Sequence, residues 1–184
     1  GARVLDALGV LDRCVLHLNS LGDLESRQAY RAALVAFLSQ HQADLSTDSK
    51  TRLVTNPLRI LDSKDAGDRE ILAAAPRLQD HLTAPSQAHF ATVAAALDAA
   101  GINWEFDPLL VRGLDYYCHS AFEFITDALG AQGTVLGGGR YDGLSEMLGG
   151  PTVAGVGWAA GVERLAMLVG ARDLHRVDIA VIAA

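Results

Sequence analysis

The sequence predicts an α+β fold, in which an antiparallel sheet with flanking helices is joined to a small helical subdomain. In the first half of the chain, apolar residues recur at intervals of three and four, as in helices that bury one face. After residue 101, short strand-like segments follow one another, and such neighbours usually pair antiparallel. With 184 residues, of which 50% are hydrophobic, the chain can bury a sizeable core.

The first elements are predicted from their spacing. Residues 3–9 have helical spacing, and residues 14–19 alternate in the manner of a short strand. Either Ser20 or Asp23 can cap the next helix, which is expected to continue to Leu38.

The middle of the chain is predicted to form short helices, and the later part to form strands. Residues 40–85 are polar and interrupted by proline and glycine, which favours short helices joined by turns. A capped helix with Ser86 near its start is expected to end at Gly101. The expected strands cover 103–107, 116–126, 134–137 and 153–160. A last apolar stripe predicts a helix over 161–169.

Composition excludes several classes of protein. The net charge is −7, which argues against a protein that coats nucleic acid by charge alone. No apolar run reaches the length of a membrane span and no signal segment is visible, so we expect a cytoplasmic protein without membrane contact. Cys14, Cys118 and the scattered histidines lack ligand spacing, so no metal site is predicted. The chain lacks an initiating methionine and ends in a strand-like segment, 177–182, which suggests an excised fragment.

A small basic island interrupts this acidic chain. Lys50, Arg52, Arg59 and Lys64 are accompanied by Asp62 as the one acidic residue after Lys50 and before Lys64. Two interpretations stay open, namely a solvated helix face and a contact to phosphate groups.

Residues 111–117, which read Val-Arg-Gly-Leu-Asp-Tyr-Tyr, carry the clearest signal of a binding site. Arginine offers a fixed fork of donors for phosphate or carboxylate, and tyrosine combines an apolar ring with a polar tip. We therefore expect this segment to hold a small charged ligand.

Two glycine-rich segments are expected to complete that site. Gly155, Gly157 and Ala159 share one face of their strand, which leaves bare backbone for either a flat ligand or a closely packed helix. Residues 137–139 are three successive glycines in a turn near Tyr141, where backbone groups can reach a ligand. The lysine of a phosphate-cradling loop is absent, so arginines would have to hold any phosphate.

These segments resemble the histidyl-tRNA synthetase family in order and spacing. The matching motifs are 112–117, 138–144 and 155–165, and the similarity extends upstream through 18–22 and 55–64. The resemblance implies the antiparallel catalytic sheet of class II aminoacyl-tRNA synthetases, with a helical insertion. It divides the chain into a catalytic-domain segment (1–22), a helical insertion subdomain (23–101), a second catalytic-domain segment (102–172) and the start of an anticodon-binding domain (173–184).

The resemblance also implies an activity. Members of the family join histidine to ATP, with Mg²⁺, to form histidyl-adenylate, and then transfer histidine to its tRNA; the full-length protein is expected to be a homodimer. Motifs 1 and 2 of class II enzymes are missing from this sequence. The fragment is therefore expected to be inactive alone.

Residue roles follow from the matched motifs. Arg112 is the expected catalytic residue, which would contact the α-phosphate and the histidine carboxylate. Tyr117 would bond the histidine imidazole. The other implied residues are Tyr116, Tyr141 and Gly138 for histidine, Arg164, Gly157 and Gly161 for ATP, and Lys50, Arg52, Arg59 and Lys64 for the tRNA acceptor stem.

Two alternatives keep the same fold without its catalysis. One is a non-catalytic paralogue such as the regulatory subunit of ATP phosphoribosyltransferase, and the other is a module that senses uncharged tRNA. The regulatory subunit typically loses the arginine and the tyrosines, whereas this chain retains Arg112, Tyr116, Tyr117 and Arg164. The retained residues favour the enzyme over that paralogue, whereas only the missing flanking sequence would exclude the sensing module.

Overall fold

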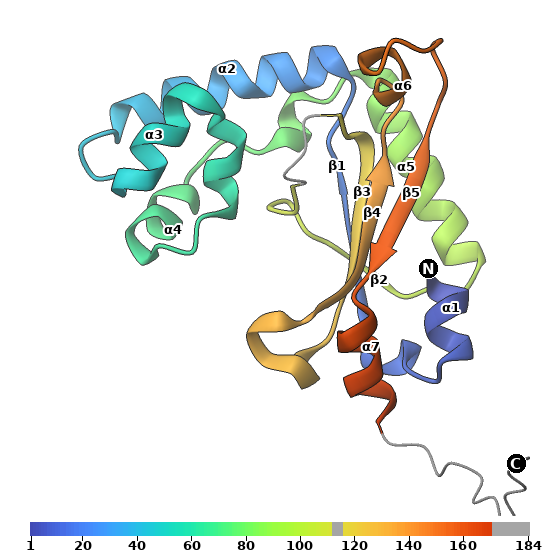
Figure 1. The fold of residues 1–184 in the computed structure, drawn as a ribbon. Helices are drawn as coiled ribbons and strands as arrows, with labels where there is room; N and C mark the ends of the chain where they lie inside the picture. Colours follow the sequence, from blue (N-terminus) through green and yellow to red (C-terminus); the bar gives the residue numbers. More distant parts are fainter. Residues whose placement is uncertain (112–115, 171–184) are drawn as a thin grey trace, which may run out of the picture.

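The computed structural model describes residues 1–111 and 116–170, and Figure 1 shows their arrangement. Arg112 and the predicted segment 173–184 lie outside the described residues. The helices are α1 (Ala2–Ala7), η1 (Leu11–Arg13), α2 (Leu24–Gln40), α3 (Thr47–Thr55), η2 (Pro57–Asp62), α4 (Ala66–Leu72), η3 (Leu78–His81), α5 (Ala84–Ala99), η4 (Asp127–Gln132), α6 (Leu144–Met147) and α7 (Val162–Val169).

Five strands form one sheet in the order β2-β1-β3-β4-β5. They are β1 (Val15–Ser20), β2 (Trp104–Phe106), β3 (Cys118–Ile125), β4 (Thr134–Arg140) and β5 (Val156–Ala160). The pairs β1–β3, β3–β4 and β4–β5 are antiparallel, as predicted. The pair β1–β2 is parallel, which the sequence did not predict. Because all of α2 to α5 lies between these two strands, the chain can return to the starting end of β1, as parallel pairing requires.

One face of the sheet is covered by α5 and α1 (Figure 1). Leu5 of α1, Leu16 of β1 and Phe124 of β3 belong to the core of this layer, and Leu97 of α5 packs against it. Helix α5 therefore packs with the sheet, although the sequence grouped it with the helical subdomain. The boundaries of that subdomain, 23–101, stay a prediction.

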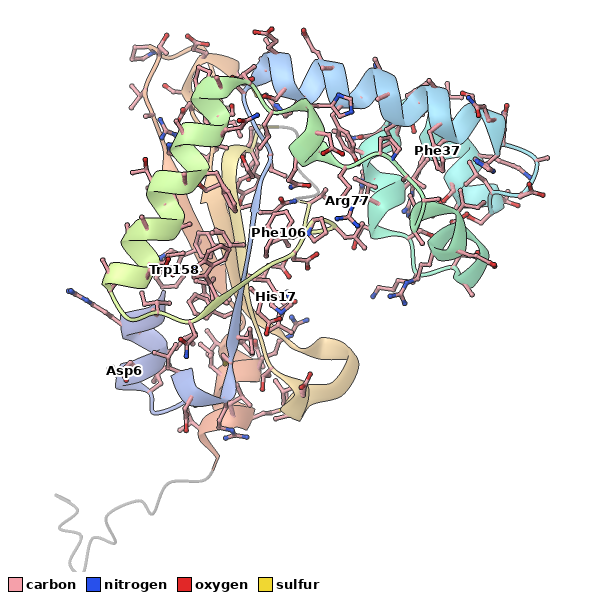
Figure 2. The ribbon with its side chains drawn as sticks, turned by 180° about the vertical axis from the view of Figure 1, so that it is seen from behind. Asp6, His17, Phe37, Arg77, Phe106 and Trp158 are labelled. Carbon is pink, nitrogen blue, oxygen red and sulfur yellow. The ribbon has the colours of Figure 1, made fainter. Side chains whose placement is uncertain are left out.

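The shorter helices α3 and α4 gather beside α2, away from the sheet (Figures 1 and 2). Leu34 and Leu38 of α2 are fully buried in their core, together with Ile60 of η2. Helix α2 begins as predicted, because the Asp23 side chain accepts a hydrogen bond from the backbone N–H of Ser26 at 2.8 Å.

A buried carboxylate joins the pieces of this helical region. Asp68 of α4 is fully buried and accepts hydrogen bonds from the hydroxyls of Ser46 (2.7 Å), Ser49 (2.5 Å) and Ser63 (2.6 Å). The backbone N–H of Ser46 also donates to it at 2.8 Å. Burial alone would raise the pKa of Asp68, but the hydrogen bonds outweigh it and lower the pKa to about 2.

We predict that Asp68→Ala lowers the free energy of unfolding by about 2–4 kcal/mol, because the hydroxyls of buried Ser49 and of half-buried Ser46 and Ser63 lose their acceptor. Urea unfolding followed by circular dichroism measures the change. The folded-state pKa of about 2 lies below the ordinary value of 3.8, so the carboxylate stabilises the fold above pH 3.8 and this contribution is lost as the pH falls towards 2.

The matched control is Asp44→Ala, which removes an exposed carboxylate from the same region and is expected to change stability by less than about 0.5 kcal/mol. Equal effects of the two substitutions would show that the buried hydrogen bonds do not stabilise this region.

Candidate functional site

Three tyrosines converge at one end of β3 and β4. The rings of Tyr116 and Tyr117 lie 4.8 Å apart between centroids, at an angle of 34°. Tyr141 meets both rings edge-on, at 5.7 Å from Tyr116 and 5.8 Å from Tyr117. Tyr117 is 9% exposed, and the other two are half-buried. We call these three residues the tyrosine cluster.

The pairing of β3 with β4 brings the cluster together. Tyr117 immediately precedes β3 and Tyr141 immediately follows β4, and Cys118 is the partner of Arg140 across the two strands. Consecutive residues in a regular strand point to opposite faces, so the sequence required an irregular backbone for both Tyr116 and Tyr117 to face one site. That condition is met, because both tyrosines lie before the strand begins.

Gly155, just before β5, and Gly157, within it, leave room for Tyr141. A Cβ atom on Gly155 would lie 2.6 Å from the Tyr141 ring, and one on Gly157 would collide with its hydroxyl. The sequence left a ligand and close packing open as reasons for this bare face. The structure shows close packing, and the packed group is a tyrosine side chain rather than a helix.

The three successive glycines have a different setting from the predicted one. They lie inside strand β4 and not in a turn, because β3 and β5 flank that strand on both sides. A Cβ atom on Gly139 would lie 2.6 Å from the carbonyl oxygen of Ser120 and 2.9 Å from the Tyr117 ring. Gly138 points to the other face, towards Trp158, so the structure brings Gly139 rather than Gly138 to the tyrosine cluster.

Two arginines form hydrogen bonds beside the tyrosine cluster. The Arg140 Nε donates to both oxygens of Asp142 at 2.9 Å, and this bond lowers the pKa of the Asp142 carboxyl. From α2, Arg27 Nη1 donates to the carbonyl oxygen of Tyr117 at 2.9 Å. The sequence analysis missed Arg27, although an arginine on the same helical face as Tyr30 and Leu34 was an available signal.

The predicted ATP residues are divided between two places. Gly157 lies beside Tyr141, as described above, whereas Arg164 and Gly161 lie where β5 leads into α7. There Arg164 Nη1 donates to the carbonyl oxygen of Thr134, at the far end of β4 from Tyr141. At about 3.3 Å per residue, that strand separates the two positions by roughly 20 Å.

The basic island lies on α3, on η2 and just beyond it. Arg52 pairs with Asp48 and also donates to the carbonyl oxygen of Arg59 at 3.1 Å, and the Lys50 Nζ donates to a backbone carbonyl. Arg59 and Lys64 are exposed. The two exposed residues are therefore the better candidates for an external partner.

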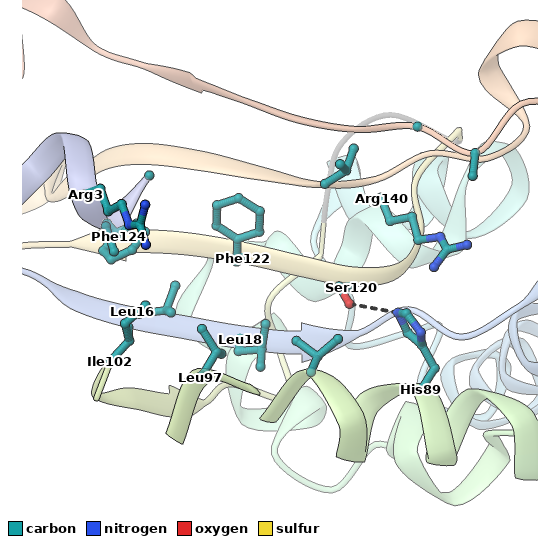
Figure 3. A pocket seen from close by; sticks show the side chains of 16 residues that line it. Arg3, Leu16, Leu18, His89, Leu97, Ile102, Ser120, Phe122, Phe124 and Arg140 are labelled. Atoms are coloured by element: carbon teal, nitrogen blue, oxygen red, sulfur yellow. Dashed lines mark hydrogen bonds between the residues drawn. The ribbon is translucent and has the colours of Figure 1, made fainter. Parts of the chain in front are cut away.

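A separate cavity of about 690 Å³ lies on the opposite face of the sheet, under α5 (Figure 3). Its walls are mostly apolar, with Leu16, Leu18 and Phe122 among them. His89 and Arg140 lie at one end. Because the cavity offers few polar groups, the tyrosine cluster is the better candidate for a small charged ligand. Among the described residues, no helix combines the length and the apolar character that crossing a membrane requires.

The fold and the site together define the class of protein. The chain has the class II aminoacyl-tRNA synthetase fold. Its sheet is antiparallel except for one short pair, helices flank the sheet, and the tyrosine cluster lies at the glycine-containing strands. The crystal structure of apo Staphylococcus aureus histidyl-tRNA synthetase superimposes with a TM-score of 0.71 at 39% identity, over 91% of this chain and 40% of that one.

Residues 16–165 match the family model described as histidyl-tRNA synthetase, and the chain belongs to that family. It is 65% identical over 171 residues to the histidine–tRNA ligase of Rhodospirillum rubrum, covering 93% of this chain and 41% of the relative. It is also 61% identical over 167 residues to the histidine–tRNA ligase of Novosphingobium aromaticivorans, covering 91% of this chain and 40% of the relative. The chain therefore spans about two fifths of the length of these relatives.

We predict that Gly139→Ala lowers the free energy of unfolding by about 1–3 kcal/mol, because the added methyl group displaces the Tyr117 ring or the Ser120 carbonyl. Thermal unfolding measures the loss, and near-ultraviolet circular dichroism reports the altered tyrosine packing. The control is Gly143→Ala, since a Cβ there meets no atom within 4 Å. If both substitutions behaved alike, close packing at Gly139 would not be what holds Tyr117.

Proposed function

We propose that this chain is part of a histidine–tRNA ligase and carries the pocket that binds the histidine side chain. The observation that carries the proposal is the tyrosine cluster, found at the matching motifs of a histidyl-tRNA synthetase family member. Such an enzyme joins histidine to ATP as histidyl-adenylate and then transfers it to tRNA.

Phenols suit a neutral imidazole as a ligand. Neutral imidazole has one N–H donor and one nitrogen acceptor, and a phenol hydroxyl can both donate and accept. In this proposal the Tyr117 hydroxyl bonds one imidazole nitrogen, while the rings of Tyr116 and Tyr141 form apolar walls. Because the ring of Tyr117 packs against both other rings, its position is fixed before the ligand arrives.

Arginines are assigned to the phosphates. Arg112 would contact the α-phosphate and the carboxylate of histidine, where negative charge develops during adenylate formation. Arg164 would hold the adenine and the γ-phosphate of ATP, which enters with Mg²⁺ as the substrate. This role requires the Arg164 guanidinium to leave the Thr134 carbonyl when ATP binds.

Further partners belong to the whole protein. We propose the histidine-specific tRNA as the acceptor, a second copy of the full-length protein as a dimer partner, and the cytoplasm as the location.

For the full-length protein, we predict histidine-dependent exchange of pyrophosphate into ATP. The isolated 184-residue chain is expected not to catalyse it, because it lacks motifs 1 and 2. In the full-length protein, Tyr117→Phe should raise the KM for histidine about tenfold, since the imidazole loses one buried hydrogen bond. Tyr30→Phe is the control, because Tyr30 lies in α2 outside the tyrosine cluster. Exchange that did not depend on histidine would contradict the proposal.

For tRNA, we predict that charge reversal of the exposed residues Arg59 and Lys64 to glutamate raises the KM for tRNA several-fold in the full-length protein. The KM values for histidine and ATP should stay unchanged, which separates a tRNA contact from a general loss of activity. Arg3→Glu on α1 is the control, at an exposed site far from η2 (Figure 1). An unchanged KM for tRNA would indicate that the basic island is a solvated surface and does not contact tRNA.

A further inference from the structure

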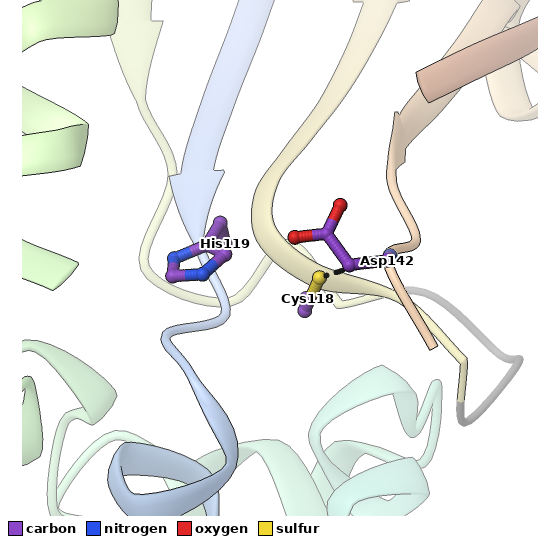
Figure 4. A group of neighbouring side chains, drawn as sticks. All are labelled: Cys118, His119 and Asp142. Carbon is purple, nitrogen blue, oxygen red and sulfur yellow. Dashed lines mark hydrogen bonds between the residues drawn. The ribbon is translucent and has the colours of Figure 1, made fainter. Parts of the chain in front are cut away.

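A group of potential metal ligands adjoins the tyrosine cluster. Cys118, His119 and Asp142 each offer one ligand atom, and these atoms lie within 4.8 Å of one another (Figure 4). Cys118 is buried and the other two residues are half-buried. We propose that these three residues form a Zn²⁺-binding site.

An irregular backbone makes this grouping possible. In a regular strand, Cys118 and His119 would point to opposite faces. The β3–β4 register shifts between Cys118 and Ala121, and His119 has a φ of 48°, in the left-handed region that residues other than glycine seldom adopt. The His119 N–H donates to the Gly22 carbonyl at 2.8 Å, and its own carbonyl accepts from the Leu21 N–H at 2.5 Å. Neighbouring main chain thus holds the unusual conformation in place.

The three ligand types select zinc. Zinc in proteins takes thiolate sulfur, imidazole nitrogen and carboxylate oxygen, whereas magnesium and calcium prefer oxygen alone. Two ligands of one tetrahedral zinc ion lie about 3.5 Å apart, given bond lengths of about 2.0–2.3 Å. Atoms already within 4.8 Å therefore need only small side-chain rotations to reach that geometry. Three protein ligands leave the fourth position to water.

A separate observation at His119 supports a bound ion. Within the part of the chain that the structure describes, the Nδ1 atom of His119 is buried and has no hydrogen-bond partner. Leaving such an atom unsatisfied costs about 1–3 kcal/mol, and coordination to a cation removes that cost.

Asp142 can serve a metal and Arg140 together. Its two oxygens accept from one Arg140 nitrogen, and a carboxylate has about four lone-pair sites. Arg140 then orients the carboxylate, as outer partners of metal ligands commonly do. When Zn²⁺ binds, the Cys118 thiol gives its proton to the solvent and the thiolate sulfur bonds to the metal.

The proposed zinc ligands are sequence neighbours of the tyrosine cluster. Cys118 follows Tyr117 directly, and Asp142 follows Tyr141 directly. A zinc ion would therefore join the two segments that carry the tyrosine cluster, in addition to the ladder between β3 and β4. Because this inference concerns binding of the metal, it does not depend on the proposed enzymatic function.

The test is metal titration of the untagged 184-residue chain after treatment with a chelator. Co²⁺ serves as the spectroscopic probe, and circular dichroism verifies that each protein is folded. We expect one equivalent of Co²⁺ to bind with a thiolate-to-cobalt absorption band in the near ultraviolet, and Zn²⁺ to displace it. Zn²⁺ should also raise the thermal midpoint of unfolding.

Matched variants identify the ligands. Cys118→Ser should abolish the band and weaken Zn²⁺ binding by at least about tenfold, and His119→Gln and Asp142→Asn should each weaken it similarly. Cys14→Ser is the control, because it removes the other cysteine and should change neither result. Failure of the folded chain to bind an equivalent of metal would overturn the proposal. So would loss of the band in Cys14→Ser, or unchanged affinity in the three ligand variants.

Discussion

The antiparallel ladder between β3 and β4 is the constraint on which the site depends. Its open end places Cys118 opposite Arg140, so the residues before β3 and after β4 must meet. Tyr117 and Tyr141 are those residues. A slip of one residue along this ladder would turn Tyr141 to the other face of the sheet, and the tyrosine cluster would be lost.

Glycine makes that ladder compatible with three bulky rings. A strand normally gains from side chains on both faces, and a glycine in its interior gains nothing from packing. Tyrosine rings replace the missing side chains, with Tyr117 over Gly139 of β4 and Tyr141 over Gly157 of β5 and the preceding Gly155. The glycines weaken the strands only at their own positions, and the space they leave allows the three tyrosine rings to converge.

Local sequence patterns predicted individual helices and strands better than they predicted how the strands pair. The apolar spacing was sufficient to predict α2, because this signal lies within the helix itself, and of the two candidate caps, Ser20 and Asp23, the structure uses Asp23. The glycines of β4 were assigned to a turn, since their own preference is for turns and only the neighbouring strands hold them extended. The parallel β1–β2 pair was missed for a similar reason, because its direction is set by where the chain returns after α5.

The candidate site shows the same division between local and long-range information. Tyr116 and Tyr117 are adjacent in sequence and were predicted together, whereas Cys118 and Asp142 are brought together only by the β3–β4 register. Tyr116 and Tyr117 escape strand alternation because they precede β3, whereas the irregular start of β3 itself brings His119 close to Cys118. A change that restored regular pairing at His119 would therefore separate the proposed zinc ligands, since Cys118 and His119 would then point to opposite faces of the strand.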